Sequence, residues 1–185
     1  MIVLPLIFLW LQGQAPAAWG FNLKDWRGNL GLAMLLGALG AIPFIFKLLD
    51  RLGGTPWTVG LMAFGIAFSY HVFQTGLPEE FFFRAYLQTH MESLLGSKWN
   101  AVILNASLFG WIHILFYLGA AQTQYHFGLA GEGLKAVAYA TLNETSGGLL
   151  YAVLWAQTRS LITLVFLHAL VNAFSMAPDL ARKLL

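Results

Sequence analysis

Long apolar stretches, separated by short segments rich in Gly, Pro or charged residues, most constrain how this chain can fold. Each stretch approaches the roughly 20 apolar residues that an α-helix needs to cross a bilayer. Asp, Glu, Lys and Arg together make up only 10% of the sequence, against about a quarter in a soluble domain. The sequence therefore predicts an all-α fold, a polytopic transmembrane helical bundle of about seven helices.

The expected helices are bounded by these polar segments. Residues 1–18 are interpreted as a first membrane helix that extends toward Trp19, rather than as a signal peptide, because no positive region precedes the apolar run. The remaining helices are expected at 29–49, 56–75, 79–95, 99–118, 134–157 and 161–177. The whole chain, 1–185, is predicted to be one integral-membrane domain.

Gly and Pro residues mark the expected interruptions. Gly76-Leu77-Pro78 is expected to break one helix, with Pro78 opening the next, and Pro178 is expected to end the last helix. Residues 119–133 are the longest polar stretch and predict a loop at one membrane face. Gly147-Gly148 predicts a kink or a point of close helix packing.

Charge and cysteine content exclude several classes of function. The net charge of +2 comes from dispersed basic residues, so no nucleic acid partner is expected. The chain has no cysteine, which excludes a disulfide, a thiolate nucleophile and a cysteine-ligated metal. Lys and Arg divide almost evenly between the two sides of the expected topology, so membrane orientation does not follow, and oligomeric state is also left open.

A Glu-Glu-x-x-x-Arg cluster, Glu79, Glu80 and Arg84, lies in this apolar context. Each ionised group near a bilayer centre costs about 2.5–3.5 kcal/mol, so the cluster must pair, face an internal cavity or carry out chemistry. Glu80 and Arg84 are spaced i and i+4 on a helix and are expected to form an ion pair. Glu79 projects about 100° away and is expected to face a cavity.

Two further polar groups sit in predicted membrane helices. His168 and Asn172 are spaced i and i+4 and share a helix face, while His113 lies on a third helix with Phe109 one turn before it. A carboxylate in an apolar site can take a proton from water, and an imidazole can hold that water. A His and an Asn can donate hydrogen bonds to an oxyanion. Together these groups suit the hydrolysis of a peptide bond without a cofactor.

Other intramembrane protease chemistries fit the sequence less well. The aspartates lie in expected loops or helix ends, and no His-Glu-x-x-His run is present. A serine–histidine dyad of Ser146 and His168 leaves the glutamate pair unexplained. Zinc held by Glu79, His113 and His168 stays open as an alternative, since zinc accepts O and N ligands. A purely structural ion pair explains Glu80 and Arg84 but not the second carboxylate.

The remaining polar residues in apolar segments are given structural roles. Glu144 is expected to be structural, near an interface or a helix break. His71, His90 and His126 are expected to be interfacial or loop residues.

Three motifs in order resemble the CAAX protease and bacteriocin-processing family, the Abi-type glutamic intramembrane proteases. Glu79-Glu80-Phe81-Phe82-Phe83-Arg84 resembles EExxxR, Phe109 to His113 resembles FxxxH, and His168 to Asn172 resembles HxxxN. Ala85 stands where the family usually has Gly. The resemblance covers about residues 76–175, which would be the catalytic core on three or more core helices, after N-terminal helices in 1–75.

The resemblance implies a role for each motif residue. Glu79 would be the general base that activates water, and His113 would help to hold that water. His168 and Asn172 would bind the substrate carbonyl and the oxyanion. Glu80 with Arg84, and Phe109, would support them.

The implied function is an intramembrane glutamic endopeptidase. It would cut a peptide bond near a membrane-anchored or lipidated terminus, as in CAAX-like processing or C-terminal sorting-signal cleavage, with a membrane-anchored substrate and the lipid bilayer as partners. The short chain of 185 residues favours a prokaryotic cell membrane. Two alternatives stay open: a non-catalytic immunity or scaffold protein of the same fold, and a zinc-dependent version of the protease.

Overall fold

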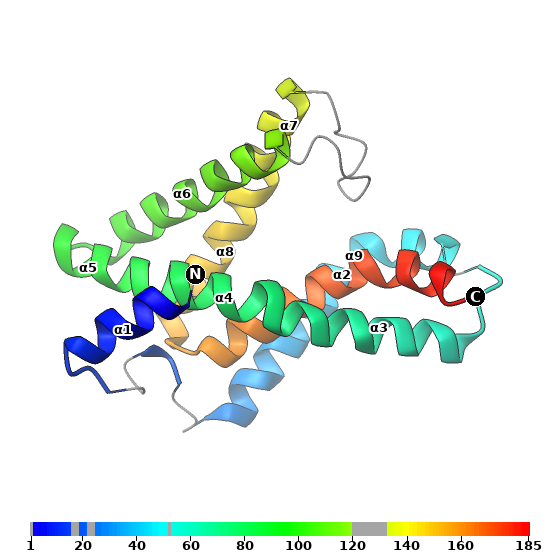
Figure 1. The fold of residues 1–185 in the computed structure, drawn as a ribbon, viewed down its shortest axis with the longest axis horizontal. Helices are drawn as coiled ribbons and strands as arrows, with labels where there is room; N and C mark the ends of the chain where they lie inside the picture. Colours follow the sequence, from blue (N-terminus) through cyan, green and yellow to red (C-terminus); the bar gives the residue numbers. More distant parts are fainter. Residues whose placement is uncertain (1, 16–18, 22–24, 52, 120–132) are drawn as a thin grey trace. The chain divides into compact units, whose positions relative to one another are not determined.

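All regular structure in the described part of the chain is helical. A computed structural model describes residues 2–15, 19–21, 25–51, 53–119 and 133–185, and its ribbon contains helices and connecting segments (Figure 1). The expected all-α class is therefore confirmed. Close contacts divide the chain into two compact units, one of residues 1–82 with 160–185 and one of residues 83–159.

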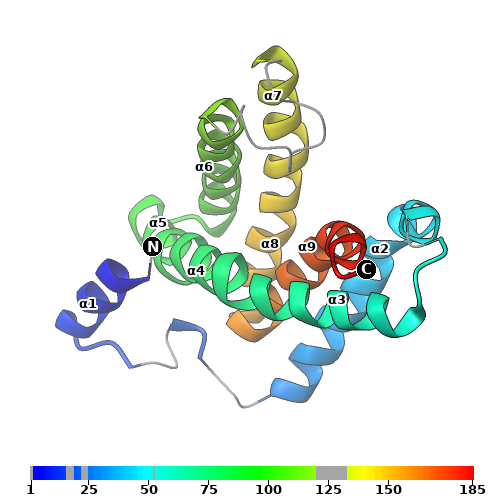
Figure 2. The same cartoon turned by 45° about the vertical axis from the view of Figure 1, so that its right-hand side comes forward.

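In the first unit, the C-terminal helix is packed against the helices that precede the glutamate pair. The unit contains α1 (Val3–Leu11), α2 (Trp26–Arg51), α3 (Trp57–His71), a π-helical turn η2 (Val72–Gly76), α4 (Leu77–Glu80) and α9 (Leu161–Lys183). Helix α9 packs against α2, α3 and η2, and it lies beside α3 in Figure 2. Buried Ala67, Ala173 and Ala177 let α3 and α9 approach closely, and Phe64 and Phe68 pack around them.

The expected break at Gly76-Leu77-Pro78 is wrong, because the chain stays helical there. In η2 the Leu77 N–H bonds to the Val72 carbonyl, five residues back, and Pro78 falls in the first turn of α4. Pro78 supplies no N–H, so the continuous helix lacks one backbone hydrogen bond at this point. Gly76 lies against α9: a Cβ at this position would come 2.9 Å from the Val165 carbonyl oxygen.

Both terminal helices differ from their predicted lengths. Helix α1 ends at Leu11 and does not extend toward Trp19, because Gly13 takes a left-handed conformation with φ 66°. Helix α9 passes through Pro178 and ends at Lys183. Pro178 costs one backbone hydrogen bond, and the burial of Ala177, Pro178 and Ala181 offsets this loss.

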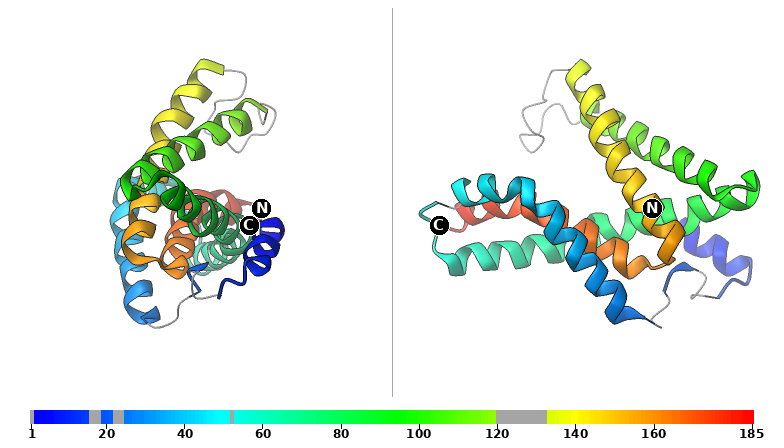
Figure 3. Two further views of the ribbon diagram at one scale, coloured as in Figure 1. Left: turned by 90° about the vertical axis from the view of Figure 1, so that its left-hand side faces the viewer. Right: turned by 180° about the vertical axis from the view of Figure 1, so that it is seen from behind.

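The second unit is built around the pairing of α6 with α8. The described part contains most of η3 (Phe81–Gln88), α5 (Thr89–Leu95), α6 (Lys98–Gly119), α7 (Gly133–Tyr139), η4 (Ala140–Glu144) and α8 (Thr145–Thr158). Figure 3 shows α6 and α8 side by side, and α6 also contacts η4. The interruption in the predicted 134–157 helix is the π turn η4, which lies before Gly147-Gly148. Most of the predicted 119–133 loop, including His126, lies outside the described residues.

Glycine permits the close contact between α6 and the α8 end of the unit. A Cβ at Gly110 would lie 2.0 Å from the Thr145 hydroxyl oxygen, and one at Gly148 would lie 3.1 Å from the Phe109 ring. Gly148 is therefore a close-packing point, as predicted. A Cβ at Gly147 would meet nothing within 4 Å.

Replacing Gly110 with alanine is expected to destabilise the second unit by about 1–3 kcal/mol, because the added methyl group forces Thr145 and its backbone to shift. Gly147→Ala is the matched control, and it is expected to be neutral or stabilising by up to about 1 kcal/mol, since alanine is the better helix former. Thermal unfolding of the purified variants in one detergent measures both changes. Equal midpoints for the two variants would contradict the packing assigned to Gly110.

Two described helices are long and apolar enough to cross a membrane, Lys98–Leu118 and Leu161–Lys183. Large apolar side chains on α6, among them Trp111 and Leu115, are exposed on its surface. Lipid contact explains such exposure in a membrane helix. The bundle of about seven spanning helices stays a prediction.

Candidate active site

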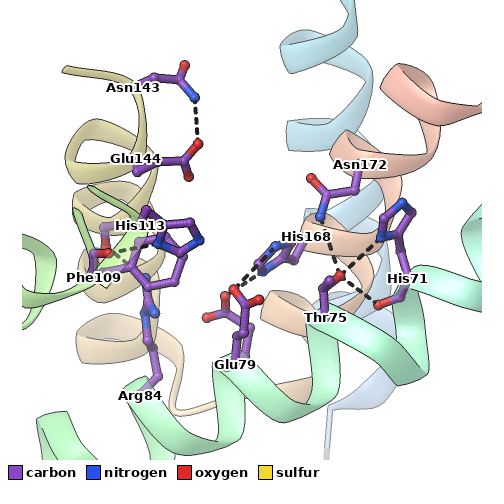
Figure 4. Close-up of polar contacts among 12 residues, drawn as sticks. His71, Thr75, Glu79, Arg84, Phe109, His113, Asn143, Glu144, His168 and Asn172 are labelled. Carbon is purple, nitrogen blue, oxygen red and sulfur yellow. Dashed lines mark hydrogen bonds and ion pairs between the residues drawn. The ribbon is translucent and has the colours of Figure 1, made fainter. Parts of the chain in front are cut away.

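Glu79 and Glu80 occupy a single α-helical turn between two π-helical segments. Helix α4 follows η2 directly, and η3 follows α4 directly. π-Helical turns are rare and occur frequently at functional sites, because the wider turn re-aims the side chains beside it. The neighbouring polar contacts are drawn in Figure 4.

His168 lies between the two glutamates in the first unit. Its Nδ1 is 2.7 Å from Oε1 of Glu80, and its Nε2 is 3.9 Å from Oε2 of Glu79 (Figure 4). The Glu80 side chain is fully buried, that of His168 is 8% exposed and that of Glu79 is 20% exposed. The more accessible carboxylate of the pair is therefore Glu79, the residue predicted to act on water.

The contact with Glu80 determines which nitrogen of His168 carries a proton. An ionised carboxylate only accepts hydrogen bonds, so Nδ1 of His168 is the donor. The other nitrogen, Nε2, is left on the side of Glu79. The sequence did not predict this contact, because the two residues are 88 positions apart and neither motif indicates which residues of the other it contacts.

Asn172 is bound to a residue that the sequence did not single out. Its Nδ2 lies 3.4 Å from the Thr75 hydroxyl, which is also 3.2 Å from His71 Nδ1 (Figure 4). Thr75 lies in η2, one turn before the glutamates, and His71 is the last residue of α3. His71 is therefore a helical, half-buried residue. Of the two alternatives expected for it, the loop is wrong and the membrane interface stays a prediction.

Arg84 belongs to the second unit and is fully buried there. Its Nη2 donates to the Gly148 carbonyl at 3.2 Å, and its guanidinium lies 4.5 Å from the centre of the Phe109 ring. Phe83 and Tyr151 complete the aromatic surroundings, at 5.5 and 5.6 Å. The arginine thus fixes Phe109 from one side. The predicted ion pair of Arg84 with Glu80 stays a prediction.

Replacing Arg84 with lysine is expected to lower the free energy of unfolding by about 2 kcal/mol or more, since an ammonium group loses the planar stacking and the fixed hydrogen-bond direction. Activity should fall together with stability, because Phe109 loses its support. Arg182→Lys is the matched control, because Arg182 forms an exposed ion pair with Asp179. It should change neither the free energy of unfolding nor the activity. Unchanged unfolding of Arg84→Lys would contradict this role.

His113 is held by the residue one turn before it. Its Nδ1 lies 2.8 Å from the Phe109 carbonyl, and the two rings are 4.4 Å apart. A carbonyl only accepts, so Nδ1 donates and Nε2 of the neutral ring carries a lone pair. His113 is therefore prepared to accept a hydrogen bond through Nε2. The i, i+4 spacing also places the Phe109 and His113 rings on one face of α6.

Glu144 ends the π turn η4 and accepts a hydrogen bond from the Tyr117 hydroxyl at 2.6 Å. Asn143 donates to the same carboxylate oxygen at 3.2 Å. The contact ties η4 to α6, which agrees with the structural role expected for Glu144. Tyr117 was not singled out in the sequence, although it lies four residues after His113.

The predicted site residues thus fall into two groups. Glu79, Glu80, His168 and Asn172 are brought together within the first unit, and Arg84, Phe109 and His113 are brought together within the second. Their predicted chemical roles stay predictions.

Comparison with known families gives one match. Residues 61–174 match the protein-family model described as type II CAAX prenyl endopeptidase Rce1-like. The matched range includes the three motifs and all of the predicted site residues. Comparisons with curated proteins and with solved structures gave no significant match.

Proposed function

We propose that this chain, which belongs to the type II CAAX prenyl endopeptidase Rce1-like family, is an intramembrane endopeptidase that uses Glu79 to activate water. The family is one of membrane-embedded proteases. The observation that supports the glutamate mechanism is the position of His168 between the exposed edge of Glu79 and the buried Glu80. A partly exposed carboxylate, a histidine whose Nδ1 donates to a buried carboxylate, and an amide within one unit suit acid–base hydrolysis.

The proposed reaction begins when Glu79 takes a proton from water and the water oxygen attacks the carbonyl carbon. In the role that the family resemblance gives it, His113 would accept a hydrogen bond through Nε2 from the second O–H of this water, and that hydrogen stays on the oxygen. Because both groups are acceptors, neither competes for the lone pair of the water oxygen. The carbonyl π electrons move to the oxygen, which becomes the oxyanion of a tetrahedral intermediate.

His168 and Asn172 stabilise this oxyanion in the proposed mechanism. His168 donates through Nε2 in its imidazolium form, since Nδ1 already donates to Glu80. The Glu80 carboxylate offsets the positive charge. As the C–N bond breaks, Glu79 passes its proton to the leaving nitrogen and the carbonyl re-forms. Each oxyanion donor contributes about 2.7–4 kcal/mol in hydrolases, and no metal or other cofactor takes part.

We propose that the substrate is a peptide whose terminus is held in or at the membrane. The family description reads type II CAAX prenyl endopeptidase, so a peptide that ends in C-a-a-X with a prenylated cysteine is the first substrate to test. A C-terminal sorting or anchoring segment is the second. The expected location is a cell membrane.

The test uses the purified chain in liposomes with two peptides that share the sequence around the bond to be cut, one anchored by a prenyl group and one by an apolar helix. Mass spectrometry of the products identifies the bond that is cut. We expect one cleavage near the anchored terminus, absent with a Glu79→Gln protein. Cleavage by the variant at the wild-type rate would sink the proposal, and no cleavage of any membrane peptide would favour a scaffold or immunity role.

A chelator separates the glutamate mechanism from a zinc mechanism. Under the proposal, activity survives treatment with a strong chelator, and the active protein contains no stoichiometric zinc by elemental analysis. Loss of activity that zinc alone restores would replace the proposal with the metal-dependent version.

A further inference from the structure

We propose that Thr75 is a positioning residue for catalysis: its hydroxyl fixes the orientation of the Asn172 amide, and His71 fixes the hydroxyl. This inference rests on the proposed function, in which Asn172 donates to the oxyanion. It adds to that mechanism two residues, Thr75 and His71, that lie outside the three motifs.

The Thr75 hydroxyl oxygen has three polar contacts within the first unit. It lies 3.2 Å from the His71 backbone carbonyl, 3.2 Å from His71 Nδ1 and 3.4 Å from Asn172 Nδ2 (Figure 4). His71 ends α3 and Thr75 follows four residues later in η2, so helix geometry brings the two together. Asn172 comes from α9, which packs along α3 and η2.

Proton counting fixes the direction of every bond in this group. A hydroxyl has one proton and two lone pairs, and a carbonyl oxygen only accepts. Thr75 therefore donates its proton to the His71 carbonyl. Its two lone pairs accept from His71 Nδ1–H and from one N–H of Asn172. All hydrogen-bonding capacity of the hydroxyl is then used.

The consequence for Asn172 is a defined amide orientation. An Asn amide has an oxygen end and a nitrogen end of nearly equal shape, so packing alone does not distinguish them. Because the hydroxyl is an acceptor toward α9, the NH₂ end of Asn172 must face Thr75. The nitrogen then keeps a second N–H for a substrate oxygen, on the helix face that it shares with His168.

The arrangement also explains why the π turn η2 matters for the chemistry. Thr75 lies within that turn, and Glu79 lies four residues later in α4. One short segment therefore carries both the residue that orients the oxyanion donor and the carboxylate that activates water. Any shift of the segment moves both groups together, which keeps their spacing fixed.

The experiment compares Thr75→Val, which has nearly the same shape but no hydroxyl, with Thr75→Ser, which keeps the hydroxyl. We expect Thr75→Val to lower kcat by about 10–100-fold with a small change in KM, since the supporting contact acts on the transition state. Thr75→Ser should restore most of the rate. Thr58→Val, the same change at an exposed position of α3, is the matched control and should leave kcat unchanged.

A double mutant isolates the contact between the two residues. In the Asn172→Ala background, Thr75→Val should cause no further loss of kcat, because the group that it orients is gone. Thermal unfolding of each variant shows whether it is folded. Equal losses in Thr75→Ser and Thr75→Val, or additive losses in the double mutant, would overturn the inference.

The proposed function and the positioning role of Thr75 fail in different ways. If Asn172→Ala itself retains the wild-type kcat, Asn172 is not an oxyanion donor and the proposed function is wrong at that residue. If Asn172→Ala is impaired while Thr75→Val has the wild-type kcat, the proposed function stands and only the positioning role of Thr75 is lost.

Discussion

Replacing Glu79 with glutamine is expected to lower kcat/KM for a membrane-anchored peptide by about 10²–10⁴-fold, the usual contribution of a general base. Glutamine keeps the size of the side chain and can still donate or accept a hydrogen bond, but it cannot take a proton from water. The fold should persist, because the side chain is 20% exposed and an amide is easily accommodated there. Circular dichroism and unfolding in detergent check this directly.

The control for this variant is Glu92→Gln. Glu92 lies on α5, where it pairs with the exposed Arg159 at the end of α8, and it has no role in the proposed chemistry. The same change of charge and shape is thus made at a carboxylate of similar exposure, 15% against 20% for Glu79, which lies outside the proposed chemistry. The glutamate mechanism would be untenable if both variants lost the same fraction of activity, or if Glu79→Gln lost none.

The sequence was sufficient for the fold class and for most helix positions. Apolar runs predicted helices close to α3, α6 and α9, and the all-α class is confirmed. The i, i+4 spacing placed His168 and Asn172 on one face of one helix. In the first unit, His168 lies beside Glu79 and Asn172 beside Thr75. These predictions succeeded because they depend on local helix geometry, which a sequence pattern records directly.

The π-helical turns could not be predicted from the sequence. Gly76 and Pro78 are typical of a helix break, so the sequence predicted one there. The turn η2 instead continues the helix, because Gly76 has no Cβ to collide with the Val165 carbonyl of α9. That contact depends on a helix nearly ninety residues later in the chain. The error was therefore one of tertiary packing, which a local pattern does not contain.

The contact of Glu80 with His168 could not be predicted for the same reason. Glu80 and Arg84 are spaced i and i+4, so the sequence predicted an ion pair within one helix. The Glu80–His168 contact joins two helices, and the Thr75–Asn172 contact does so too. Arg84, for its part, has the Gly148 carbonyl and the Phe109 ring as neighbours. Long-range polar pairs in an apolar protein are thus the main information that the structure adds.

Replacing Glu80 with glutamine is expected to affect catalysis and stability together. A neutral amide can accept from His168 Nδ1, but it cannot offset the charge of the imidazolium that donates to the oxyanion. Removing the carboxylate that orients a catalytic histidine lowers kcat by about 10⁴-fold in a serine protease, so a loss of about 10²–10⁴-fold is expected here. Because Glu80 and His168 are both buried, the free energy of unfolding should also fall, by about 3–5 kcal/mol.

A double-mutant cycle with His168→Gln distinguishes this contact from a general effect of losing a buried charge. If Glu80 acts through His168, the loss of kcat in the double mutant should equal that of His168→Gln alone, and the unfolding free energies should show a coupling above about 1 kcal/mol. Fully additive effects would mean that Glu80 contributes through its other surroundings and that His168 is oriented without it.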